Sequence, residues 1–100
     1  MKKWMPDYDN AGSPSTPSSG TTYTATADGW YDLREIVRYG NDTRLQVKVN
    51  DQIIIQKIST SSVLAQFSGL IQVATGDKMV IIFNSDSGQP TFRFIPGRWV

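Results

Sequence analysis

Few residue spacings in this chain match those of chemically active sites. Asn84, Asp86 and Gly88 alternate like the first ligands of a calcium loop, where side-chain oxygens converge and glycine permits the turn. The bidentate carboxylate that closes such a loop would fall at position 95, which is Ile95. The spacing therefore favours a plain hairpin loop, and we expect no metal site and no cofactor.

Side-chain catalysis has almost no candidates. The chain contains no His and no Cys, so the commonest general base, thiol nucleophiles and disulfides are missing. Its one glutamate, Glu35, shares an otherwise apolar strand face, which indicates a bulge or a sheet edge there rather than a catalytic acid. No serine stands in a Gly-x-Ser-x-Gly turn. We predict a protein that is not an enzyme and has no catalytic residues.

Aromatic side chains offer a different chemistry, because their faces stack on the apolar faces of sugars. Five of them are candidates for such a platform: Tyr23, Trp30, Tyr31, Tyr39 and Trp99. Alternation along a strand favours the core for Tyr31 and for Phe92. Trp30 and Trp99 occupy polar-alternating or terminal positions, so they are the candidate exposed aromatics, and the choice between core and sugar platform stays open for them.

Length, charge and hydropathy limit the classes of partner that we expect for this chain. At 100 residues the chain suffices for one core. Ten Lys and Arg against nine Asp and Glu give a net charge of +1, which argues against nucleic acid as a ligand. No run of eighteen apolar residues exists for membrane insertion, and Pro6 and Asp7 interrupt the basic start before a signal peptide can form. We therefore expect synthesis in a reducing cytoplasm without a signal peptide.

Residues 1–20 are expected to form a flexible N-terminal arm. From Asp9 the sequence is nearly all Ser, Thr, Gly, Pro and Asn, and ordering such residues costs about 1–2 kcal/mol each with no apolar burial to offset it. Trp4, Met5 and Tyr8 are large apolar side chains in this arm, which makes them a candidate partner-binding segment. A frayed terminus with incidental aromatics is the alternative.

Residues 21–100 are expected to form an all-β domain. Short runs of β-branched and aromatic residues alternate with turn residues at intervals of roughly ten, and Gly69 marks a bulge or corner between two of the runs. The expected strands are 21–27, 30–39, 43–49, 52–58, 63–67, 70–73, 78–83 and 90–96. These seven or eight short strands predict an antiparallel two-sheet sandwich of jelly-roll type.

Strand alternation predicts an oligomer interface. With a two-residue loop at Asn50-Asp51, Val47 pairs with Ile54, which puts Ile54 on the core face and leaves Ile53 and Ile55 outside; a bulge would instead expose Ile54. A strand apolar on both faces repeats the pattern at 78–83. The candidate oligomer interface is therefore Ile53, Ile54, Ile55, Val80 and Ile82.

The order of several short motifs resembles small domains of bacteriophage and prophage tail fibres and tail-associated proteins. The motifs span most of the chain, at residues 6–8, 23–30, 47–53, 76–80 and 92–96. The resemblance implies a jelly roll of the tumour-necrosis-factor and complement type, a homotrimer, and a position in the virion. No binding residue of that family matches a motif here.

Two functions follow as expectations. The first is a non-enzymatic, tail-fibre-like virion protein that binds another virion component or a host-surface glycan or receptor. The alternative is a free-standing bacterial carbohydrate-binding module.

Overall fold

The computed structural model describes residues 1–37, 43–59, 65–83 and 90–100. These residues form strands and a single turn of 3-10 helix, η1 (Tyr8–Asn10). The strands are β1 (Trp4–Pro6), β2 (Thr22–Thr24), β3 (Gly29–Val37), β4 (Thr43–Val49), β5 (Gln52–Ser59), β6 (Ala65–Val73), β7 (Lys78–Phe83) and β8 (Thr91–Trp99).

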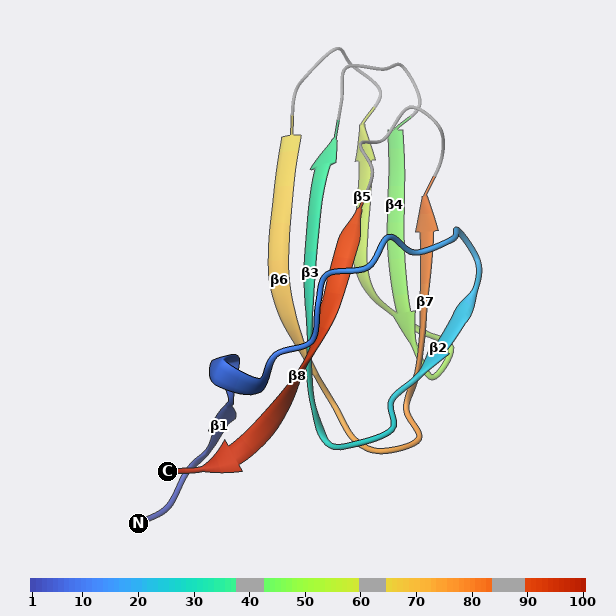
Figure 1. Cartoon of the computed structure of the whole chain (residues 1–100). Coiled ribbons are helices and arrows are strands. Elements are labelled where there is room, and N and C mark those ends of the chain that lie inside the picture. The colour runs from blue at the N-terminus through green and yellow to red at the C-terminus, as the bar shows by residue number, and fades with distance from the viewer. Residues whose placement is uncertain (38–42, 60–64, 84–89) are drawn as a thin grey trace.

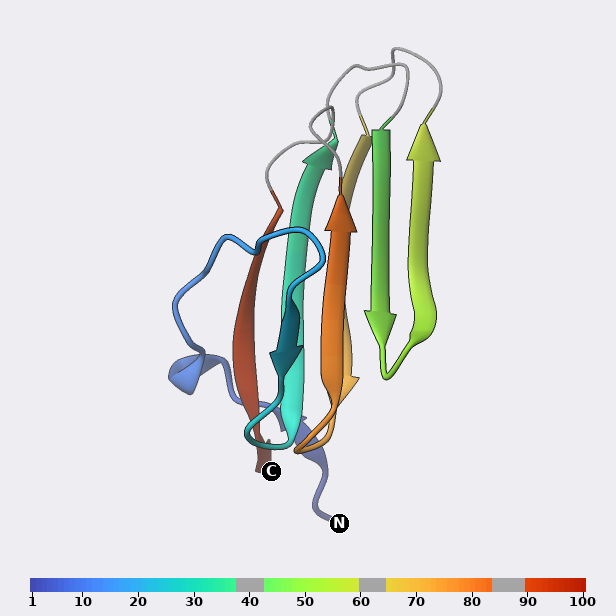
Figure 2. The same cartoon turned by 90° about the vertical axis from the view of Figure 1, so that its right-hand side faces the viewer.

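The strands make two antiparallel sheets of four. One has the order β1-β8-β3-β6 and the other β2-β7-β4-β5. Chain-adjacent strands therefore often lie in different sheets, as in a jelly roll. The two layers lie side by side in Figure 1, and Figure 2 shows the β2-β7-β4-β5 sheet in front of the other. The all-β jelly-roll sandwich expected from the sequence is confirmed.

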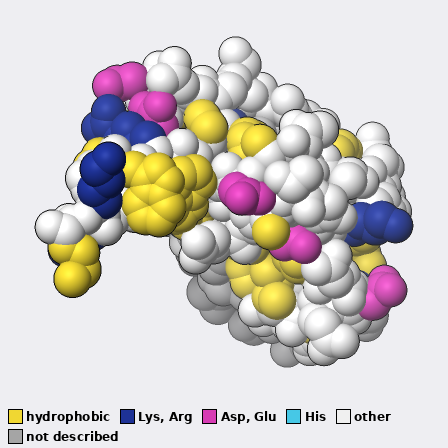
Figure 3. Space-filling model, turned by 90° about the horizontal axis from the view of Figure 1, so that it is seen from below, with side chains coloured by type: hydrophobic (Ala, Val, Ile, Leu, Met, Phe, Trp, Pro, Cys, Tyr) yellow, Lys and Arg dark blue, Asp and Glu magenta, His cyan; other side chains and the backbone are white. Residues whose placement is uncertain are grey.

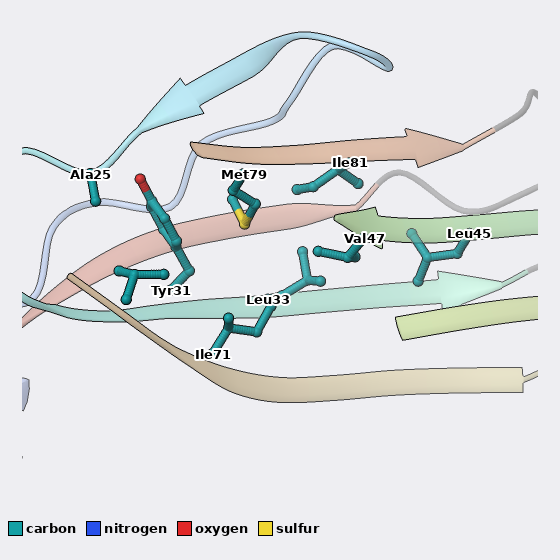
Figure 4. Close-up of a cluster of buried hydrophobic side chains, with 9 residues drawn as sticks. Ala25, Tyr31, Leu33, Leu45, Val47, Ile71, Met79 and Ile81 are labelled. Atoms are coloured by element: carbon teal, nitrogen blue, oxygen red, sulfur yellow. The ribbon is translucent and has the colours of Figure 1, made fainter. Parts of the chain in front are cut away.

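The core lies between the sheets. Inward positions of both layers supply its fully buried side chains, among them Leu33 from β3, Val47 from β4 and Ile81 from β7 (Figure 4). Tyr31 is buried here and Phe92 packs against the cluster, as their alternation predicts. Tyr31 meets Phe92 and Phe94 edge-on, with ring centroids 5.8 and 5.7 Å apart.

The β4–β5 hairpin settles the register left open by the sequence. Asn50 and Asp51 both have positive φ, 51° and 66°, which is the conformation of a type I′ turn. Beyond the Lys48–Ile53 pair the register shifts, so that Val47 pairs with Ile55 instead of Ile54. Ile54 is thus the extra residue of a bulge and is exposed, as the bulged alternative predicts.

Two other predicted bulges are absent from the described strands. β6 runs unbroken from Ala65 to Val73 and pairs Gly69 with Leu33 without a register shift, so the two expected strands are one. β3 likewise passes through Glu35 without a shift against β6, although its pairing with β8 ends at Arg34. The β3–β6 ladder is uninterrupted, so no bulge forms at either residue, and the sheet-edge alternative for Glu35 stays a prediction.

Residues 1–20 lie along β8 and then cross to the second sheet (Figure 1). Backbone hydrogen bonds join Lys3 to Val100, Asp7 to Pro96, Gly12 to Phe94 and Ser15 to Phe92, and Gly20 donates to Ile81. Thus this segment covers an edge of β8 that would otherwise expose unpaired backbone groups. A boundary at residue 20 with a flexible arm before it stays a prediction.

At the end of the sandwich drawn lowest in Figure 1, two carboxylates accept hydrogen bonds from residues of neighbouring turns. Asp28 accepts hydrogen bonds from the backbone and hydroxyl of Thr75, at 2.7 and 3.0 Å, and these bonds lower its pKa. Asp77 accepts from the Ala74 amide at 2.8 Å and from the Asn50 side chain at 3.0 Å, which lowers its pKa as well. These side chains link turns of both sheets.

Candidate binding site

All three tryptophans of the chain meet on the outer face of the β1-β8-β3-β6 sheet. Trp4 lies beside Trp30 with ring centroids 6.2 Å apart and an interplanar angle of 26°. Its other neighbour is Trp99, at 5.3 Å and 58°. Each of the three comes from a different strand. From the sequence alone, Trp4 belongs to the expected arm, and Trp30 and Trp99 are the candidate exposed aromatics.

Register explains why they meet. β1 pairs with β8 so that Trp4 faces Trp99 across the ladder, and Pro6 faces Gly97. Paired residues share a face of the sheet. Gly97 leaves room for the Trp4 indole, because a Cβ at this position would collide with the ring. Because Gly97 has no side chain, the indole of Trp4 can pack directly against β8.

The cluster is partly a small apolar core and partly a surface. Ile95 lies on the same face, directly across from Trp30, and is fully buried there while η1 packs against β8. Trp4 and Trp30 are half-buried, whereas Trp99 is 64% exposed. Figure 3 shows a broad hydrophobic patch beside Lys and Arg side chains on the side of the molecule where β1 and β8 end.

An ion pair lies next along the same face. Asp32 is two residues beyond Trp30 on β3 and pairs with Arg93 of β8. Arg93 Nε donates to Asp32 Oδ2 at 2.9 Å, and Arg34 Nε lies 3.6 Å from Oδ1. The side chain of Asp32 is 9% exposed, Arg93 29% and Arg34 68%. We call this surface, with Trp4, Trp30, Trp99, Asp32, Arg34 and Arg93, the tryptophan face.

The predicted interface residues lie mostly on the opposite side of the molecule. Lys48 pairs with Ile53 on one side and Val80 on the other, and Ile82 follows on β7, so these share the outer face of the second sheet. Ile54 is exposed at the adjacent bulge. We call Lys48, Ile53, Ile54, Val80 and Ile82 the aliphatic face. Ile55 differs from the expectation: the bulge turns it inward, where it packs against the core.

The other candidates are scattered. Met5 and Tyr8 are exposed, so of the predicted arm segment only Trp4 joins the cluster. The Asn84–Gly88 loop and Tyr39 lie outside the described residues. Among the residues that the structure describes, no three acidic side chains gather as metal ligands. Within the same ranges, no helix is long and apolar enough to span a membrane.

Neither the Asp32–Arg93 ion pair nor the cluster of three tryptophans was predicted from the sequence. Alternation places Trp30, Asp32 and Arg34 on one face of β3, and that signal was available. Nothing local pairs Trp4 with Trp99, because that contact depends on the register of two strands at opposite ends of the chain. Chemically, the result is a set of indole faces for stacking beside guanidinium groups for hydrogen bonding.

Comparisons with known proteins inform the fold. No family model matches the chain, and no curated protein matches it. Among solved structures, bushbaby GITRL, of the tumour-necrosis-factor family, matches with a TM-score of 0.60 at 16% identity, over 85% of this chain and 76% of that one. Pika GITRL matches with 0.56 at 16%, over 82% and 76%. Likeness at this identity shows the jelly-roll fold alone.

A third solved structure is the CBM36-1 domain of a multidomain xylanase from the hindgut metagenome of Trinervitermes trinervoides. It aligns over 100% of this chain and 97% of that one at 13% identity, with a TM-score of 0.42. This score is too low to support an argument about the chain.

Proposed function

We propose that this chain is a non-enzymatic binding domain that holds a sugar on the tryptophan face. The observation that carries the proposal is the meeting of Trp4, Trp30 and Trp99 on one outer face, with Trp99 largely exposed. Indole faces suit the apolar faces of sugar rings, and the rigid ladder of β1, β8 and β3 holds them in place before the ligand arrives.

We propose further that the domain belongs to a phage or prophage virion, as a homotrimeric, tail-fibre-like protein that contacts a host-surface glycan or another virion component. The order of the sequence motifs supports this setting. The aliphatic face supports the oligomer, because its isoleucines lie on the side away from the tryptophan face. One surface is then available for assembly while the other meets the ligand.

The test is an array of purified bacterial surface polysaccharides probed with the full chain. We expect specific members to bind, and Trp99→Ala to weaken that binding by about fivefold to tenfold, the worth of one aromatic stack. Tyr8→Ala removes an exposed aromatic ring that lies outside the tryptophan cluster and outside the aliphatic face, so it is the matched control and should bind as the wild type does. An array without bound members, or equal binding by the Trp99 variant, would contradict the proposal.

The second candidate, a free-standing carbohydrate-binding module, uses the same three tryptophans without a virion partner. Met5 and Tyr8 discriminate between the two, because they are exposed on the arm and lie outside the tryptophan cluster. A virion component should lose co-purification with tail proteins encoded by neighbouring genes when both are changed to Ala, with sugar binding retained. A free-standing module should show no such protein partner.

A further inference from the structure

The charges on the tryptophan face point to a narrower class of sugar. The proposed function rests on the indoles alone and says nothing of the ligand's charge. Trp30, Asp32 and Arg34 alternate along β3, so all three project from the same side of the sheet. A ligand that stacks on the tryptophans therefore extends toward the ion pair if it continues along β3.

The two signs of charge on this face are unequally exposed. Asp32 is almost covered at 9% exposure, whereas Arg93 at 29% and Arg34 at 68% reach solvent. Two guanidinium groups against one carboxylate leave a net positive charge, and the part that faces outward is the positive one. An approaching ligand meets cations before it meets the carboxylate.

The contact atoms leave the guanidinium groups able to bind more. Both arginines approach Asp32 through Nε. Their terminal nitrogens are not used in these two contacts, and arginine presents five donors in a planar fork that matches a carboxylate. Asp32 thus acts as an anchor that orients Arg93 and restrains Arg34, with donor groups left over.

The spacing along the strand fits a sugar. Trp30 and Arg34 are separated by four residues, and a strand rises about 3.3–3.4 Å per residue, so about 13 Å separates the stacking surface from the more exposed guanidinium. Arg93, across from Asp32, lies at about half that distance. Leu70, on the other side of Asp32, adds an exposed apolar contact. A short sugar chain covers this length.

We infer that the ligand of the tryptophan face is an acidic polysaccharide whose uronic acid carboxylates are bound by Arg34 and Arg93 while a sugar ring stacks on the indoles. This deepens the proposed function and rests on it. Charge complementarity separates it from a neutral sugar, which would leave the outward guanidinium groups without a partner.

The experiment uses uronic-acid-containing capsular polysaccharides from the array, each paired with its carboxyl-reduced form, in which the carboxylate has become a neutral alcohol. We expect the acidic form to bind the full chain about tenfold tighter than the reduced form, the worth of a charge-assisted hydrogen bond. Arg34→Gln should remove most of that preference. Lys78→Gln, which removes an exposed cation on β7 outside both defined faces, should leave it unchanged.

Three results would overturn the inference. If the reduced forms bind as tightly and still depend on Trp99, the proposed function stands and the acidic class falls. If Arg34→Gln keeps the full preference while its thermal melt matches the wild type, Arg34 does not bind the carboxylate and the inference falls. If dextran sulfate binds more tightly than the uronic acid polymers, the preferred anion is not a carboxylate. An array with no bound member overturns both proposals.

Discussion

The two outer faces of the sandwich differ in what they expose, although each is built on four antiparallel strands. The tryptophan face combines stacked rings with a covered carboxylate between two arginines. The aliphatic face carries the exposed isoleucines Ile53 and Ile54 beside Lys48. Rings fixed by cross-strand packing suit recognition of a small rigid ligand, whereas an aliphatic sheet surface suits burial against another protein. The proposed function uses this difference: it assigns recognition to one face and assembly to the other.

The largest effect should come from the aliphatic face. Ile53→Asn removes a side chain worth about 1.5–3 kcal/mol when buried, so three copies weaken a trimer by about 4.5 kcal/mol or more, roughly a thousandfold in the association constant. Sedimentation equilibrium measures this. Leu70→Asn is the matched control on the tryptophan face, because Leu70 is 47% exposed and Ile53 52%. A wild type that is monomeric would contradict this prediction, and so would a Leu70 variant that dissociates while the Ile53 variant stays trimeric.

The next effect tests whether the tryptophan face depends on its covered carboxylate. Asp32→Ala leaves the partly buried Arg93 without its partner, and we expect the free energy of unfolding to fall by about 2 kcal/mol. Urea denaturation followed by circular dichroism gives the value. Arg34→Gln should change it by less than about 0.5 kcal/mol, since an exposed pair at this distance contributes little. Equal losses from both variants would mean that Arg34 has a structural role.

A smaller effect is expected from disturbing the packing of Trp4 against Gly97. Gly97→Ala places a methyl group against the indole, and we expect a loss of about 1 kcal/mol, because a half-buried ring can shift away. The near-ultraviolet circular dichroism of the tryptophans should change at the same time. Gly12→Ala is the control, since its Cβ would lie 3.4 Å from the Phe94 carbonyl oxygen, an ordinary contact. An unchanged tryptophan spectrum in the Gly97 variant would contradict the packing described for Trp4.

The smallest expected effect belongs to neither face and serves as their reference. The pKa values of Asp28 and Asp77 are lowered in the folded protein, so the unfolded chain takes up protons first as the pH falls. Their stabilisation is present above about pH 4, the ordinary range of aspartate, and is lost as the pH drops through the lower folded values. Melting temperatures between neutral and acid pH should show this loss.

Asp77→Asn should lower the melting temperature at neutral pH and flatten its fall in acid. Asp51→Asn is the control, because Asp51 lies on the β4–β5 turn outside the hydrogen bonds that tie the turns together. Both outer faces should respond alike to Asp77→Asn. Selective loss of sugar binding in this variant would mean that the turns position the tryptophan face in particular.

The sequence predicts the sandwich well because local alternation decides which face of each strand is buried. Leu45 and Val47 are buried, and Tyr31 and Phe92 belong to the core, as period-two patterning requires. The hairpin turn is also local, and Asn50-Asp51 adopts the positive φ values that these residue types tolerate.

The binding site is harder to predict, since it is assembled by register between distant segments. Trp4 is an arm residue in the sequence and a stacked ring in the fold only because β1 pairs with β8. The orientation of Ile55 is also hard to predict from the sequence, although it depends on the register of a single hairpin. Because Ile54 is the bulged residue, Ile55 faces the core in its place, and no feature of three consecutive isoleucines reveals which one is extra.

The pairing of β1 with β8 and of β2 with β7 has a consequence for how the chain reaches its fold. Trp4 meets Trp99 and Thr22 meets Val80, so residues made early by the ribosome wait for partners made much later. Contacts of such high sequence separation slow folding, because a long loop must close, at a cost in chain entropy, before these contacts can stabilise the chain. Until then the edges of β8 and β7 lack their partners, and unpaired edges promote aggregation. Recombinant yield should therefore depend on growth temperature and expression rate more than on the stability of the finished domain.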